Sequence, residues 1–148
     1  MMRTKTMAMM VFFTLGLMLG AGPSVFAKQG HESAGDSKVT IPATVGEILA
    51  AVDLQIIDLE KTITAKALDK VHVTAFSIRD LLLALPDKPS ALSATGKTAL
   101  LSSLNKIKQQ AGLLDKYGDS GDLAQTKAVF AKFKDEIEKI KQIPGLKP

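Results

Sequence analysis

Cysteine is absent from the 148 residues of this chain, and so is tryptophan. Without a thiol there can be no disulfide, zinc–thiolate site, iron–sulfur cluster, cysteine nucleophile, covalent c-type haem or bacterial lipid anchor. Methionine is confined to positions 1, 2, 7, 9, 10 and 18. These absences exclude several classes of protein and leave the length of one ordinary domain.

Residues 1–27 have the layout of a secretory signal peptide. Arg3 and Lys5 precede an apolar stretch over 7–19, and small or modest residues stand at −3 and −1 before the end of the segment. The alternative is an uncleaved membrane anchor, but the apolar run is near 15 residues and a span needs roughly 20. We expect cleavage after Ala27 and a periplasmic or secreted protein.

Removal of this leader changes the charge of the chain. The whole sequence has 19 Lys and Arg against 15 acids; two of the bases lie in the leader, so the net charge falls from +4 to +2. Nucleic-acid binding needs a basic face and usually stacking rings, so no nucleic-acid partner is expected. No second apolar stretch is long enough to span a membrane. The aromatics beyond the leader are only Phe76, Tyr117, Phe130 and Phe133.

Residues 28–43 are polar and lack an apolar period, which predicts a disordered lead-in. The first helix is expected to start at Thr44, because Thr44 and Glu47 form a capping-box pattern. Its apolar stripe has the 3-4-3-4 spacing of one helix face: Leu49, Val52, Ile56, Leu59 and Ile63.

Three more helices are predicted after it. The second starts near Asp69 and stops at Pro86, the third starts at Ser90 or Ser93, and the fourth follows Asp122. The turn over 117–122 has two glycines to take positive φ. The stripes of these helices are Leu68, Val71, Ala75, Ile78, Leu82 and Leu85; Leu100, Leu104, Ile107, Ala111 and Leu114; and Leu123, Phe130, Phe133, Ile137 and Ile140, with Thr126 in place of one apolar residue.

No segment alternates with period two, so the predicted fold is all-α: an antiparallel up-down-up-down four-helix bundle over 44–143, with 144–148 as a tail. Burial of about 20 stripe residues is enough to fold such a domain without a cofactor. The stripes hold no run of polar residues that would line an active site. We therefore expect a non-enzymatic protein and predict no cofactor, with copper or nickel as the ions to consider.

Two histidines are candidate metal ligands. His72 lies at the edge of the second stripe, where the alternative is a boundary histidine packed on Phe76, because a lone histidine has no second ligand on its own helix. His31 lies in the lead-in, where trimming of Lys28 would place it third from the amino terminus. That position suits a square-planar copper(II) or nickel(II) chelate.

An acidic cluster follows the third helix. Asp115, Asp119 and Asp122 could supply oxygen ligands to calcium, but their spacing is not that of an EF-hand. The preferred interpretation makes Asp122 a helix cap and Asp119 a turn residue.

The region 44–143 resembles the periplasmic four-helix bundles of the cytochrome c-prime and soluble b-type cytochrome superfamily. The resemblance rests on the long first helix, on Gly121-Asp122-Leu123, and on Ala75-Phe76-Ser77-Ile78-Arg79-Asp80-Leu81. The c-prime type needs Cys-x-x-Cys-His in its last helix, where this chain has Lys132 to Glu136. The b-type needs a methionine on the first helix and a histidine on the last, and neither is present.

The chain is therefore more similar to haem-less exported bundles found beside heavy-metal efflux systems in Gram-negative bacteria. That resemblance implies a role in periplasmic metal homeostasis or resistance, as a binding or accessory protein whose partner is a metal ion or a periplasmic protein. One alternative is a haem or electron-transfer bundle with His72 as an atypical axial ligand. Another is a protein–protein interaction bundle, for example a homodimer, because Leu81 and Leu83 widen the apolar face of the second helix.

Overall fold

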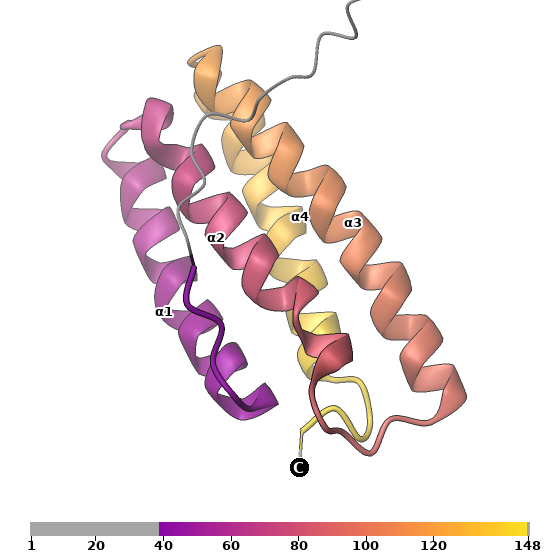
Figure 1. Ribbon diagram of the computed structural model, residues 1–148. Helices are drawn as coiled ribbons and strands as arrows, with labels where there is room; N and C mark the ends of the chain where they lie inside the picture. The colour runs from indigo at the N-terminus through magenta and orange to yellow at the C-terminus, as the bar shows by residue number, and fades with distance from the viewer. Residues whose placement is uncertain (1–38, 148) are drawn as a thin grey trace, which may run out of the picture. The chain divides into compact units, whose positions relative to one another are not determined.

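A computed structural model describes residues 39–147 (Figure 1). The predicted signal peptide, residues 1–27, lies outside the described residues. All regular structure within 39–147 is helical, with four α-helices and no strand, which confirms the all-α prediction. No helix in this part of the chain is both long and apolar enough to cross a membrane.

The helices are joined by short connections, two of which contain a 3-10 turn. α1 and α2 pack against each other, α2 packs against α3, and α3 packs along α4 (Figure 1). The bounds are α1 Val45–Thr64, η1 Leu68–Lys70, α2 Val71–Leu83, η2 Leu85–Asp87, α3 Ala94–Asp119 and α4 Leu123–Lys141.

Side-chain caps fix the starts of three helices. The Thr44 hydroxyl accepts from the Glu47 amide at 3.2 Å, and the Glu47 carboxylate accepts from the Thr44 amide at 3.0 Å, so the predicted capping box is present. Ser93, and not Ser90, caps α3, while Asp122 caps α4 as expected. Local hydrogen-bonding chemistry thus sets where these helices begin.

The core is formed by the predicted stripes. Of the 21 apolar positions named from the sequence, all but Ile56 and Leu123 are buried, and these two pack partly buried against the others. Thr126 is fully buried and its hydroxyl donates to the Asp122 carbonyl at 2.7 Å, which satisfies its polar atom.

Other apolar side chains add to this core. Leu81 and Leu83 do not offer the partner surface suggested for the second helix, because Leu81 is 1% exposed and Leu83 packs against the core. Val39 from the predicted lead-in also packs there, and Leu146 from the predicted tail is fully buried. The domain therefore uses apolar residues on both sides of its helical region.

The second helix departs from its predicted start. Asp69 lies in the 3-10 turn η1, and α2 begins only at Val71 and has 13 residues. At the other end Pro86 lies in η2, one turn beyond the helix, in agreement with its expected role as a stop. α2 is consequently half the length of α3, which has 26 residues.

Gly118 has a different role from the one predicted. Only Gly121 of the two turn glycines has positive φ, at +69°, while α3 continues through Gly118 to Asp119. A Cβ at Gly118 would lie 2.7 Å from the Leu68 carbonyl oxygen and 3.4 Å from the Val71 Cβ. Glycine at this position therefore allows α3 to lie directly against the start of α2.

A buried carboxylate connects α3 to α4. Glu136 is 3% exposed, and its two oxygens accept from Lys106 Nζ at 3.3 Å and Lys139 Nζ at 3.2 Å. Burial by itself raises the pKa of this carboxyl, but hydrogen bonds from Ser103, Lys139 and Lys106 outweigh it and hold the pKa below its ordinary value of 4.5. The ionised form is thus the one that the fold stabilises.

The close approach at Gly118 predicts a specific loss of stability. Gly118→Ala should lower the free energy of unfolding by about 1–3 kcal/mol, because the methyl group would collide with backbone. Gly112→Ala in the same helix is the control: a Cβ there meets nothing within 4 Å, so stability should stay the same or rise by up to about 1 kcal/mol. Urea denaturation measures both, and equal stabilities would show that α3 can move away from Leu68 without cost.

The Glu136 contacts predict a pH dependence. Glu136→Gln should destabilise the fold by about 1–3 kcal/mol at pH 7. A carboxyl with a lowered folded-state pKa stabilises the protein above the unfolded value of 4.5 and loses that effect as the pH falls through the folded value. The stability gap between wild type and variant, measured by denaturation from pH 7 to pH 3, should therefore narrow below about 4.5.

Asp135→Asn, at the exposed neighbouring position, is the matched control and should cost little at any pH. A Glu136→Gln gap that stays constant down to pH 3 would contradict this account of the buried carboxylate.

Candidate metal centre

His72 lies in the first turn of α2 and is half-buried. Its ring packs edge-on against Phe76, with ring centroids 6.5 Å apart and an angle of 62° between planes. The Arg79 guanidinium lies 4.4 Å from the Phe76 centroid on its other side along the helix. The predicted packing of His72 on Phe76 is therefore present, in the edge-to-face arrangement that aromatic rings favour.

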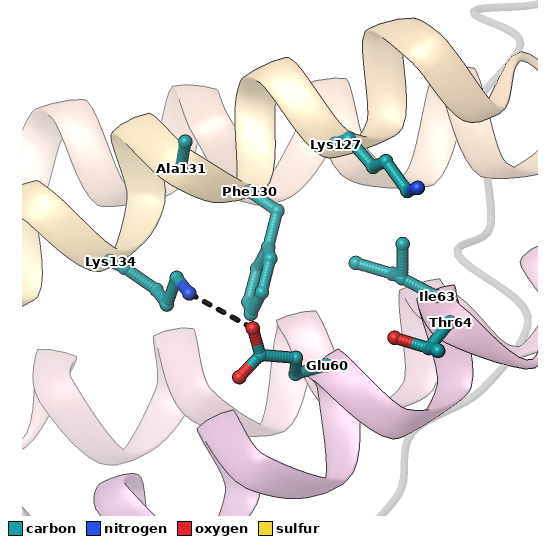
Figure 2. A pocket seen from close by; sticks show the side chains of 7 residues that line it. All are labelled: Glu60, Ile63, Thr64, Lys127, Phe130, Ala131 and Lys134. Atoms are coloured by element: carbon teal, nitrogen blue, oxygen red, sulfur yellow. Dashed lines mark hydrogen bonds and ion pairs between the residues drawn. The ribbon is translucent and has the colours of Figure 1, made fainter.

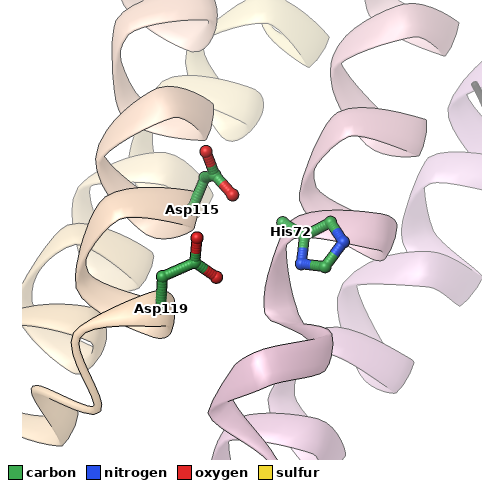
Figure 3. Close-up of side chains that lie close together, drawn as sticks. All are labelled: His72, Asp115 and Asp119. Carbon is green, nitrogen blue, oxygen red and sulfur yellow. The ribbon is translucent and has the colours of Figure 1, made fainter. Parts of the chain in front are cut away.

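Two carboxylates from another helix approach this imidazole. Asp115 and Asp119 are four residues apart on α3 and therefore lie on the same helix face. One ligand atom from each, together with one ring nitrogen of His72, all lie within 4.8 Å of one another. Figure 3 shows the two carboxylates on one side and the imidazole facing them from α2.

The imidazole has an unsatisfied nitrogen. His72 Nδ1 is buried and has no hydrogen-bond partner within residues 39–147. A buried polar atom without a partner costs free energy, and native proteins usually satisfy such atoms with protein, water or an ion. The same region therefore contains an unpaired nitrogen and two carboxylates.

The carboxylates also lack a charged partner. Neither Asp115 nor Asp119 forms an ion pair with any Lys, Arg or His among the described residues, whereas Glu136 accepts from two lysines. Two carboxylates so close together repel each other, and a cation between them would relieve that repulsion. Asp119 is exposed, which leaves a path from solvent to this position.

Sequence reasoning found these residues but not their grouping. No second ligand for His72 is predicted on its own helix, but the structure brings two carboxylates close to it from α3. The preferred interpretation of the acidic cluster is confirmed for Asp122, whose Oδ1 accepts from the Gln125 amide at 3.0 Å and caps α4. It is wrong for Asp119, which is the last residue of α3 and not a turn residue. His31 lies outside the described residues.

The chemistry of this donor set suits a first-row divalent ion. Imidazole nitrogen is a ligand for zinc, copper and nickel, whereas calcium takes oxygen ligands alone. Bonds of about 2.1 Å in a tetrahedral site place ligand atoms roughly 3.4 Å apart. The three candidate atoms lie within 4.8 Å of one another, so no pair would have to approach by more than about 1.4 Å to close the trio. Three protein ligands leave room for water or a further donor.

No protein-family model matches the chain, and no curated protein or solved structure is significantly similar to it. The geometry of the site therefore carries the functional argument.

Proposed function

We propose that this protein is a non-enzymatic, exported helical-bundle protein that binds a divalent transition-metal ion between α2 and α3 and acts in metal homeostasis or resistance. The observation that carries the proposal is the convergence of His72, Asp115 and Asp119 within 4.8 Å. Copper(II), nickel(II) and zinc(II) are the ions that a nitrogen and two carboxylate oxygens favour.

Each residue has a distinct role in this proposal. His72 supplies the nitrogen ligand that selects a transition metal over calcium and magnesium. Asp115 and Asp119 supply oxygen ligands and offset the charge of the ion. All three must be free of protons to bind, so metal uptake releases protons and weakens in acid.

Location and topology belong to the same proposal. The layout of residues 1–27 supports export to the periplasm. The helices are inferred to run up-down-up-down, because α1–α2 and α3–α4 are packed pairs joined by few residues, and short connections favour antiparallel neighbours. Under this proposal the ion site lies on a folded domain outside the cytoplasm.

Two alternatives remain from the sequence. A haem bundle with His72 as axial ligand is less well supported, because the groups that face His72 are carboxylates. A partner-binding role, with a second copy or another protein, is supported by Leu54 and Ile57, which are 67% and 50% exposed on α1. In the partner-binding hypothesis, Leu54 and Ile57 would form the contact surface instead of the buried Leu81 and Leu83.

The proposal predicts a single metal site in the protein with His31→Ala, a substitution that removes any chelate at the lead-in. Calorimetric titration with Cu²⁺, Ni²⁺ and Zn²⁺ should give one-to-one binding of at least one ion. Saturation at 100 times the dissociation constant should stabilise the fold by about 2.7 kcal/mol, which appears as a raised thermal midpoint.

The candidate metal-binding side chains are tested by further substitutions in the protein that carries His31→Ala. His72→Ala and Asp115→Asn should each weaken binding at least about tenfold, since even residues behind the ligands have effects of that size. Asp69→Asn, an exposed acid of η1 that is not in the group, should bind normally. Unchanged binding in His72→Ala, or no saturable binding of any of the three ions, would overturn the proposal.

A further inference from the structure

A second concave surface lies between α1 and α4, away from the metal centre. It is a groove of about 330 Å³, at the lower end of the roughly 300–1,000 Å³ of small-molecule sites. Residues at i, i+3 and i+4 on α1 face residues at i, i+3, i+4 and i+7 on α4 (Figure 2). The groove is lined by Glu60, Ile63, Thr64, Lys127, Phe130, Ala131 and Lys134.

The middle of the groove is apolar. Phe130 is 5% exposed and Ile63 is 2% exposed, so both are held firmly by the core while one side of each contributes to the lining. Ala131 adds a small apolar side chain at an exposed position of α4. A hydrocarbon group in the groove would therefore touch Ala131 and the small exposed edges of Phe130 and Ile63, which the core holds in place.

The ends of the groove are basic. Lys134 Nζ lies 3.2 Å from Glu60 Oε1 and 4.7 Å from the centroid of the Phe130 ring. Lys127, one turn before Phe130 on α4, forms no ion pair with any described residue, and Figure 2 shows its side chain on the Ile63 side of the groove. With two lysines and one glutamate, the lining has a surplus of positive charge beside an apolar centre.

We propose that this groove binds a small amphipathic anion: an aryl or short alkyl group that carries a carboxylate or sulfonate. The hydrocarbon part lies on Phe130 and Ile63, and the anionic group pairs with Lys127. Glu60 opposes binding, because it occupies Lys134 and repels the ligand. This site is separate from the proposed metal centre and does not depend on it.

The charge requirement is tested with two dyes that share one apolar body. The probes are 8-anilinonaphthalene-1-sulfonate and N-phenyl-1-naphthylamine, which lacks the sulfonate. Fluorescence titration of the full chain should show saturable binding of the sulfonate, at least severalfold tighter than that of the neutral dye. The affinity for the sulfonate should fall as salt is added, because exposed charges are screened.

Matched variants locate the site. Ala131→Glu places a carboxylate in the groove and should reduce sulfonate binding at least about tenfold, whereas Ala128→Glu, exposed on the same helix but outside the groove, should not. Lys127→Gln should weaken binding roughly two- to fivefold, and Lys132→Gln, an exposed lysine elsewhere on α4, should weaken it less.

A gain in affinity is the sharpest expectation, because misfolding does not produce it. Glu60→Gln removes the competing carboxylate and should tighten sulfonate binding roughly two- to fivefold, with the thermal midpoint nearly unchanged since the Glu60–Lys134 pair is largely exposed. When the sulfonate dye is titrated into the protein, the NMR chemical-shift changes of backbone amides should be concentrated in residues 60–64 and 127–134.

Three results would overturn the proposal. One is equal affinity for the two dyes. Another is equal loss in Ala131→Glu and Ala128→Glu, which would indicate nonspecific charge effects. The third is a set of amide shifts centred on the exposed Leu54 and Ile57 of α1.

Discussion

The contact between α3 and the start of α2 is the constraint on which the candidate metal centre depends. Gly118 meets the Leu68 carbonyl and Val71 with no room for a side chain, so α3 can lie this close to the start of α2 only with a glycine there. Asp119 follows directly and Asp115 precedes by one turn, while His72 follows Val71. Packing at the glycine and grouping of the three polar side chains are thus two results of one close approach. A larger residue at position 118 would move α3 away from the start of α2 and would also move Asp115 and Asp119 away from His72.

Two polar clusters in which α3 meets a neighbouring helix, α4 in one and α2 in the other, differ in how their carboxylates are stabilised. At Glu136 the carboxylate is buried but receives hydrogen bonds from Ser103 and two lysines, so its pKa falls and its charge is satisfied inside the protein. At the other cluster Asp115 and Asp119 face an imidazole whose Nδ1 has no partner within residues 39–147. In the first cluster both oxygens of Glu136 have hydrogen-bond partners, and these contacts support the packing of α3 on α4. The second would be completed by a group from solution, which is why the functional proposal rests on it.

The sequence predicted the helices well because their determinants are local. The capping box at Thr44, the cap at Asp122 and the stop at Pro86 act within a few residues, and the apolar stripes follow directly from helical periodicity. The role of Gly118 could not be predicted in this way, because it depends on which carbonyl of another segment lies opposite. The same limit applies to His72: its carboxylate partners belong to a helix that the η2 connection brings back alongside. The spacing of Asp115 and Asp119 on one face was the available signal, but nothing local indicated which element they would face.

The distance along the chain between His72 and Asp119 has a further consequence for a protein without cysteine. An ion held by both residues would join two points separated by about 47 residues, which by the chain-entropy estimate for a cross-link of that loop length corresponds to about 4 kcal/mol. The domain would then have the equivalent of a disulfide that forms without an oxidant and is removed by a chelator or by acid. Its resistance to unfolding would then follow the supply of the ion rather than the redox state of its surroundings.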